Sequence, residues 1–134
     1  MSIGFRWAAT AVLAAIASTA APLVPRADAQ DYEFQLVHAE LRQSDATEVS
    51  VRLVRKSTGE PVPGAVIFAR RIDMAPDGMP TMQAPLDALP PTTAGIYRFS
   101  TRLDMEGAWQ LSVAAKVQGE EGTVVGKLLL KVLP

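Results

Sequence analysis

Hydrophobic and polar residues alternate along three stretches of this chain, and this period of two restricts the fold more than any other feature of the sequence. The clearest case is residues 109–117, where one side carries Trp109, Leu111, Val113, Ala115 and Val117. Residues 47–54 and 95–103 repeat the pattern. Such alternation indicates antiparallel strands with one buried and one solvated face. Beyond Tyr32, helical spacing never persists for a turn, so the sequence predicts an all-β fold.

Three further segments, residues 32–39, 65–72 and 123–132, complete a set of six predicted strands. Residues 57–64 and 119–122 separate strands with the glycines and prolines typical of turns. Residues 73–94 contain five prolines and leave room for at most one short edge strand. The prediction is an immunoglobulin-like antiparallel β-sandwich of about seven strands.

The first 29 residues are typical of a signal peptide. Arg6 supplies the positive charge, residues 7–17 are an unbroken apolar run, and Ala27-Asp28-Ala29 offers small residues before a cleavage site. The apolar run is shorter than the ~20 residues that a membrane span needs. We therefore expect a periplasmic protein of one domain, residues 30–134, without stable membrane insertion after cleavage. An uncleaved anchor is the alternative.

The composition excludes several classes of function. There is no cysteine, hence no disulfide, thiolate nucleophile, haem attachment motif or blue-copper centre. A single histidine falls short of the nitrogen ligands of a zinc catalytic site. With 13 basic and 14 acidic side chains, the chain has no basic footprint for nucleic acid or anionic lipid. No serine has a nucleophile-elbow context, and we expect no enzyme activity.

Methionine is the only residue type in the exported part that offers a soft metal ligand. Met74, Met79 and Met82 lie within nine residues of one another, and Met105 follows in a later predicted turn. Thioether sulfur suits soft ions such as copper(I), written Cu(I) below, and Ag(I). Methionine is also a flexible filler of apolar gaps. Both interpretations stay open.

Strand direction decides whether these methionines meet. If the strands alternate in direction and residues 73–94 cross the sandwich once, the strands ending near residues 39, 72 and 103 leave at the same end. His38, Met74 and Met105 then share one rim. If residues 73–94 return to the end that they left, Met105 moves to the opposite rim.

Acidic residues accompany the methionines in the sequence. On the first topology they make the same rim acidic, where they attract cations at long range or keep the loop soluble. They are Asp73, Asp77, Asp87, Asp104 and Glu106.

Three short motifs carry a resemblance to a known family. The first motif leads into the predicted strand at residues 65–72 and reads Gly59-Glu60-Pro61-Val62-Pro63-Gly64-Ala65. The second starts the strand at residues 95–103 and reads Gly95-Ile96-Tyr97-Arg98-Phe99. The third leads into the strand at residues 109–117 and reads Met105-Glu106-Gly107-Ala108-Trp109. In these motifs the chain resembles the FixH-like and YtkA-like extracytoplasmic β-sandwich domains. The resemblance implies a periplasmic accessory domain without enzyme activity, of a kind associated with copper handling, metal efflux or assembly of respiratory oxidase. The chain departs from it at Gln83, where many such domains have a histidine.

Two functional hypotheses follow. The first is an accessory protein that binds Cu(I) or Ag(I) through Met74, Met79, Met82 and Met105, with help from His38, and passes the metal to an envelope partner in efflux or oxidase assembly. The second is a structural interaction module without metal, which docks on an envelope protein through the proline-rich residues 73–94. In that case the methionines form an adaptable apolar contact surface.

Overall fold

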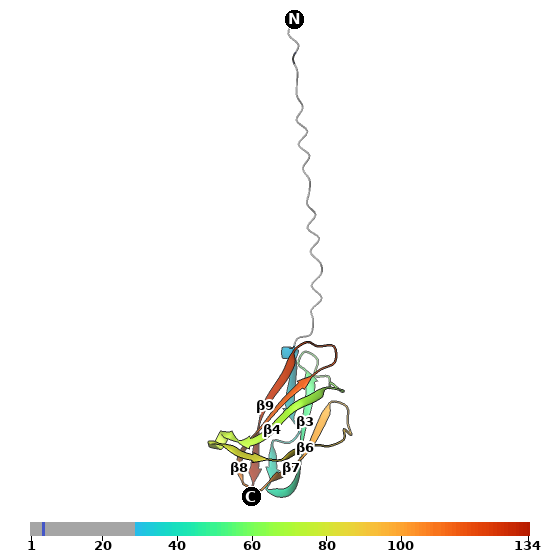
Figure 1. Ribbon diagram of the computed structural model, residues 1–134. Helices are drawn as coiled ribbons and strands as arrows, with labels where there is room; N and C mark the ends of the chain where they lie inside the picture. The colour runs from blue at the N-terminus through green and yellow to red at the C-terminus, as the bar shows by residue number, and fades with distance from the viewer. Residues whose placement is uncertain (1–3, 5–28) are drawn as a thin grey trace.

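Two β-sheets packed face to face make up the folded part of the chain (Figure 1). The computed structural model describes Gly4 and residues 29–134, so the predicted signal peptide lies almost wholly outside the described residues. Within these residues, no helix is long and apolar enough to span a bilayer. In chain order the elements are η1 (Ala29–Asp31), β1 (Tyr32–Leu36), β2 (Glu40–Arg42), β3 (Ser44–Arg55), β4 (Val66–Met74), η2 (Ala75–Asp77), β5 (Met79–Ala84), β6 (Leu86–Ala88), β7 (Ile96–Leu103), β8 (Gly107–Lys116) and β9 (Thr123–Leu133).

The strand order confirms the predicted immunoglobulin-like sandwich. One sheet has the order β1-β3-β7-β6 and the other the order β2-β9-β8-β4-β5. Neighbouring strands are antiparallel except for β2 and β9, which are parallel. The six predicted strands correspond to β1, β3, β4, β7, β8 and β9.

The strand prediction is wrong in the proline-rich segment. Residues 73–94 were expected to hold at most one short strand, but they contain β5 and β6, one at an edge of each sheet. An edge strand needs hydrogen bonds on one side only and therefore tolerates Pro80. The three-residue strand β2 was also not predicted, because three residues are too few to establish an alternation.

The hydrophobic residues of the alternating pattern form the core between the two sheets. The side chains of Trp109, Leu111, Val113 and Ala115 on β8 are at most 2 % exposed. They belong to one hydrophobic cluster with buried residues of β3 and β7: Val49, Val51, Leu53, Phe99 and Leu103. Full burial of a large apolar side chain contributes about 1.5–3 kcal/mol. Since the chain has no cysteine, packing rather than disulfide cross-linking holds the sheets together.

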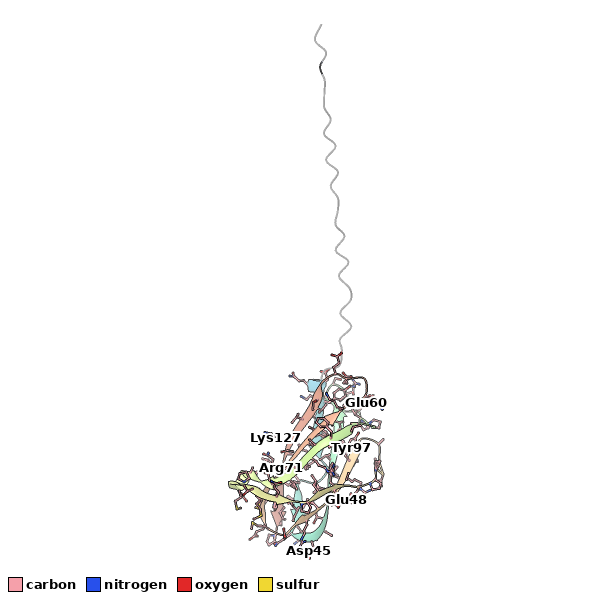
Figure 2. All side chains as sticks on the ribbon, in the orientation of Figure 1. Asp45, Glu48, Glu60, Arg71, Tyr97 and Lys127 are labelled. Carbon is pink, nitrogen blue, oxygen red and sulfur yellow. The ribbon has the colours of Figure 1, made fainter. Side chains whose placement is uncertain are left out.

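A tyrosine fastens the loop between β3 and β4 to β7. The Tyr97 hydroxyl donates a hydrogen bond to the Val62 carbonyl (2.7 Å) and accepts one from the Ala65 N–H (2.9 Å). Figure 2 labels Tyr97 beside this loop. Gly95 has a φ of +79° and lies so close to Pro61 that an added Cβ would collide with it. Two of the three family-like motifs are therefore in contact with each other.

The strand pairing shows which topology the chain adopts. β5 pairs antiparallel with β4, and β6 pairs antiparallel with β7, so residues 75–95 cross the sandwich once. Asp73 near the end of β4 pairs with Gln110 near the start of β8. Because Met105 lies between β7 and β8, Met74 and Met105 are at the same end of the sandwich. We call it the methionine end, defined by Met74, Met79, Met82 and Met105.

Candidate functional site

The hairpin between β4 and β5 carries three of the four methionines. Met74 ends β4, η2 turns the chain, and Met79 starts β5 directly opposite Met74. Gly78 makes the turn at a φ of +76°, with its N–H donating to the Ala75 carbonyl (2.9 Å). Only glycine adopts such a left-handed conformation without strain. Met82 follows in β5, one residue before Gln83, which pairs with Asp73.

Met74 differs from the other three methionines in its burial. Its side chain is 1 % exposed and belongs to the core, whereas Met79, Met82 and Met105 are 37 %, 39 % and 38 % exposed. The Met74 methyl group lies against Gly107, only 2.8 Å from where a Cβ at that glycine would stand. Met74 therefore packs the base of the methionine end, and the other three residues are partly exposed at the surface.

Asp77 attaches the hairpin to β8. Its Oδ2 accepts a hydrogen bond from the Ala108 N–H (2.9 Å). The same oxygen is so close to Gly107 that a side chain there would collide with it. This contact holds the turn before Met79 against the start of β8, two residues after Met105.

The turn that carries Met105 is fixed from two sides. The indole N–H of the buried Trp109 donates to the Met105 carbonyl (3.0 Å). The Gln43 side-chain amide donates to the neighbouring Asp104 carbonyl (2.6 Å). The backbone at Met105 is thus held in place, and Trp109 is in direct contact with it.

A buried carboxylate organises the other side of the hairpin. Asp73 is 5 % exposed, so its assignment to an exposed acidic rim is wrong. It accepts hydrogen bonds from Arg71 Nε (2.6 Å) and the Ala75 N–H (2.9 Å), while another Arg71 nitrogen donates to the Pro80 carbonyl (2.5 Å). Burial alone would raise the pKa of Asp73, but the Ala75 and Arg71 contacts outweigh it and lower this pKa.

His38 lies at the same end of the molecule but at the other edge of the five-stranded sheet. It precedes β2, and the order β2-β9-β8-β4-β5 puts four strand spacings between β2 and β5. At about 4.8 Å each, these amount to roughly 19 Å. The His38 side chain is exposed. The structure therefore places the β4–β5 hairpin and Met105 at the same end of the sandwich and leaves His38 apart from β5.

The hollow beside the methionine end does not contain the methionines. It has a volume of about 600 Å³ and is lined by Glu40, Asp77, Glu106 and Pro134 among others, and none of the four methionines lines it. In the part of the chain that the structure describes, no three His, Asp or Glu side chains gather as metal ligands.

Sequence reasoning identified the methionines but missed the residues that position them. Asp73 precedes Ala75 by two residues, which is the spacing of an Asx turn. In such a turn the aspartate side chain accepts a hydrogen bond from the N–H two residues later. That signal was present in the sequence. No comparable signal links Asp77 to Ala108 or Arg71 to Pro80, because the first contact depends on the packing of η2 against β8 and the second on an irregular β4–β5 register.

Comparison with known proteins gives a family match and several distant structural likenesses. A model of the YtkA-like family matches residues 26–114. No curated protein matches the sequence.

Three solved structures have a similar fold at low sequence identity. The Lin-41 filamin domain is 15 % identical, with 81 % of this chain and 96 % of that chain covered and a TM-score of 0.46. The Yersinia pseudotuberculosis adhesin InvE is 19 % identical, with coverages of 80 % and 28 % and a TM-score of 0.44. The ZirS C-terminal domain is 11 % identical, with coverages of 100 % and 80 % and a TM-score of 0.43.

Proposed function

The chain belongs to the YtkA-like family, and from this premise we propose that it is a non-catalytic accessory domain of the periplasm that binds Cu(I) or Ag(I) at its methionine end. The partner would be an envelope protein of a metal-efflux or respiratory-oxidase assembly. The relation to FixH-like domains is a prediction from the three sequence motifs.

The observation that supports the metal proposal is that three partly exposed methionines belong to two segments at the same end of the sandwich. Met79 and Met82 belong to one hairpin and Met105 to another turn, and the Asp77–Ala108 hydrogen bond joins the two. Thioethers bind soft monovalent ions without releasing a proton, so the site would work in an acidic compartment. Exposed ligands on two segments allow an incoming ligand from a partner to replace them one at a time.

The perturbed ionisable groups support a role without catalysis. Strongly shifted pKa values in a cleft are the usual mark of catalytic residues. Here the groups with shifted pKa values make structural contacts: Asp73 with Arg71, Glu48 with Arg98, Tyr32 with Glu120 and Tyr97 with the Val62–Ala65 loop.

Titration of residues 30–134 with Cu(I) or Ag(I) tests the proposal, because Trp109 is the only tryptophan in this range and contacts Met105. We expect a change in Trp109 fluorescence and shifts of the methyl resonances of Met79, Met82 and Met105. Replacement of these three residues by Leu should abolish binding. Retention of binding in that variant, or no response at about millimolar free metal, would disprove the site.

Two variants serve as controls. Met74→Leu changes a buried thioether with little change in volume and should cost less than about 1.5 kcal/mol in stability. His38→Gln removes the imidazole at the far edge of the sheet. Both should keep the metal affinity of the unaltered protein.

A second candidate function is docking of an envelope partner through residues 73–94 without metal. The observation in its favour is that five consecutive residues of β5, Met79 to Gln83, are exposed at a sheet edge. A pull-down from envelope extracts would compare the unaltered protein with a variant in which this segment is shortened. Unchanged partners would rule out docking by this segment.

A further inference from the structure

β4 is paired along most of its length on one side but only at its end on the other. β8 pairs with β4 from Val66 to Asp73, whereas β5 pairs only with Ile72, Asp73 and Met74. Every second residue of an antiparallel strand turns its N–H and C=O towards each side. Among the described residues, no other backbone segment hydrogen-bonds to residues 66–71. We call residues 66–71 the free edge of β4.

A single β-bulge, between Ile67 and Ala69, interrupts the free edge. Proteins shield sheet edges with such bulges and also with proline, lysine or very short strands. β5 contains Pro80, and β2 and β6 have three residues each. The free edge has six residues, Val-Ile-Phe-Ala-Arg-Arg, without proline, glycine or lysine, and its Val66 and Phe68 are 61 % and 56 % exposed.

Two adjoining hollows follow the free edge. One of about 510 Å³ is lined by Ile67 and Arg70 of β4 and, on its other side, by Leu89 and Phe99. The second, of about 470 Å³, is lined by Phe68, Arg70 and Leu86 among others. Arg70 lines both, so the two hollows meet at its side chain beside the unpaired backbone, and we call them together the groove; apolar side chains line much of it.

Arg70 gives the groove a positive charge without an acidic counterpart. Its Nε donates to the Leu86 carbonyl (2.8 Å), and no carboxylate of the described chain forms an ion pair with it. Arg71 and Arg98, in contrast, are paired with Asp73 and Glu48. A ligand with a carboxylate at this position would complement the groove.

We propose that the free edge of β4 binds an extended segment of a partner protein, which adds to the sheet as a further strand. The unpaired backbone supplies the hydrogen bonds, the groove takes apolar side chains at alternate positions, and Arg70 selects a carboxylate. A second copy of the same edge would bring two arginines and no acidic residue, so the charges favour a different partner. None of the three exposed methionines lines either hollow, and the proposal does not depend on metal binding.

The test uses synthetic peptides of about ten residues in which valine and threonine alternate around one central glutamate. Added to residues 30–134, such a peptide should shift the amide resonances of residues 66–71 and slow their exchange with solvent. A peptide with lysine in place of glutamate should bind at least about tenfold more weakly. A peptide with N-methyl groups on alternate backbone nitrogens facing β4 should not bind.

Variants of the protein locate the site. Phe68→Lys should weaken peptide binding at least about tenfold, whereas Val125→Lys, at a similarly exposed position on β9, should change it less than about twofold. Arg70→Glu should reverse the preference in favour of the lysine peptide. Equal binding of the N-methylated peptide, or no binding of any peptide at about 1 mM, would overturn the proposal. So would concentration-dependent dimerisation of the protein that Phe68→Lys abolishes, because the occupant would then be a second copy.

Discussion

The carboxylate of Asp73 links acidity to stability at the scale of a single residue. Its pKa is lowered in the folded state, so its contribution to the free energy of unfolding is complete above the ordinary aspartate pKa of about 3.9. The contribution falls as pH drops below that value and is lost as pH passes through the lowered pKa. Asp73→Asn should therefore have a flatter dependence of unfolding free energy on pH in this range, measured by urea denaturation.

Asp87→Asn, at an exposed position on β6, is the matched control for this measurement. Other carboxylates also titrate in the same range, so the informative quantity is the difference between the two variants. Equal slopes for Asp73→Asn and Asp87→Asn would show that the Arg71 and Ala75 contacts do not favour the ionised form.

Gly107 offers a second test at this scale. It has a φ of +135°, and an added Cβ would meet Asp77 Oδ2 and the Met74 methyl group. Gly107→Ala should lower the free energy of unfolding by about 2–4 kcal/mol through strain and overpacking together. Gly119→Ala, at a φ of +82° with no atom within 4 Å, isolates the strain and should cost about 1–2 kcal/mol. Equal losses in urea denaturation would mean that the crowding at Gly107 relaxes freely.

At the scale of secondary-structure elements, Tyr97 joins β7 to the loop that enters β4. Tyr97→Phe leaves the Val62 carbonyl and the Ala65 N–H without their partner and should destabilise the fold by about 1–3 kcal/mol. Tyr32→Phe removes a hydroxyl bonded to the partly exposed Glu120, which water replaces, and should cost less than about 1 kcal/mol. Thermal or urea denaturation of both variants gives the comparison. A Tyr97→Phe loss no larger than that of Tyr32→Phe would contradict this role.

Most elements were predictable because burial on one face leaves a period of two in the sequence. Trp109, Leu111 and Val113 show it for β8, and β3 and β7 behave alike. The edge strands β2, β5 and β6 show no such alternation in the sequence. All residues of β5 except Ala84 are exposed, so hydrophobicity does not alternate along it, and its place follows from pairing with β4. The free edge of β4 was equally invisible, because it depends on where β5 stops.

At the scale of the whole molecule, the sequence predicted part of the candidate site. Strand direction brings Met74 and Met105 to one end only if residues 73–94 cross the sandwich once, and the sequence left that crossing open until the pairing of β5 with β4 and of β6 with β7 decided it. Strand direction did not place His38 at the far edge of the sheet, because the order of strands within a sheet is set by packing and not by direction. The burial of Met74 has the same origin, as it depends on the absence of a side chain at Gly107.

Export is a prediction that concerns the entire chain. Expression in a Gram-negative host should yield a periplasmic protein whose intact mass corresponds to residues 30–134, because the apolar run is too short for a stable span. Mass spectrometry of the periplasmic and membrane fractions measures this. Full-length protein in the membrane fraction would instead indicate an uncleaved anchor.

The opposite placement of the two chain ends determines how the protein should be handled in the laboratory. β1 begins at the end far from the methionines, whereas Pro134 lines the hollow beside Asp77 and Glu106 (Figure 1). The 11 residues of β9 separate the two ends by about 36 Å at ~3.3 Å per residue. A polyhistidine tag at the C-terminus would add imidazoles next to the methionine end and compete for copper. Purification and surface immobilisation through residue 30 leave that end untouched and facing the solution.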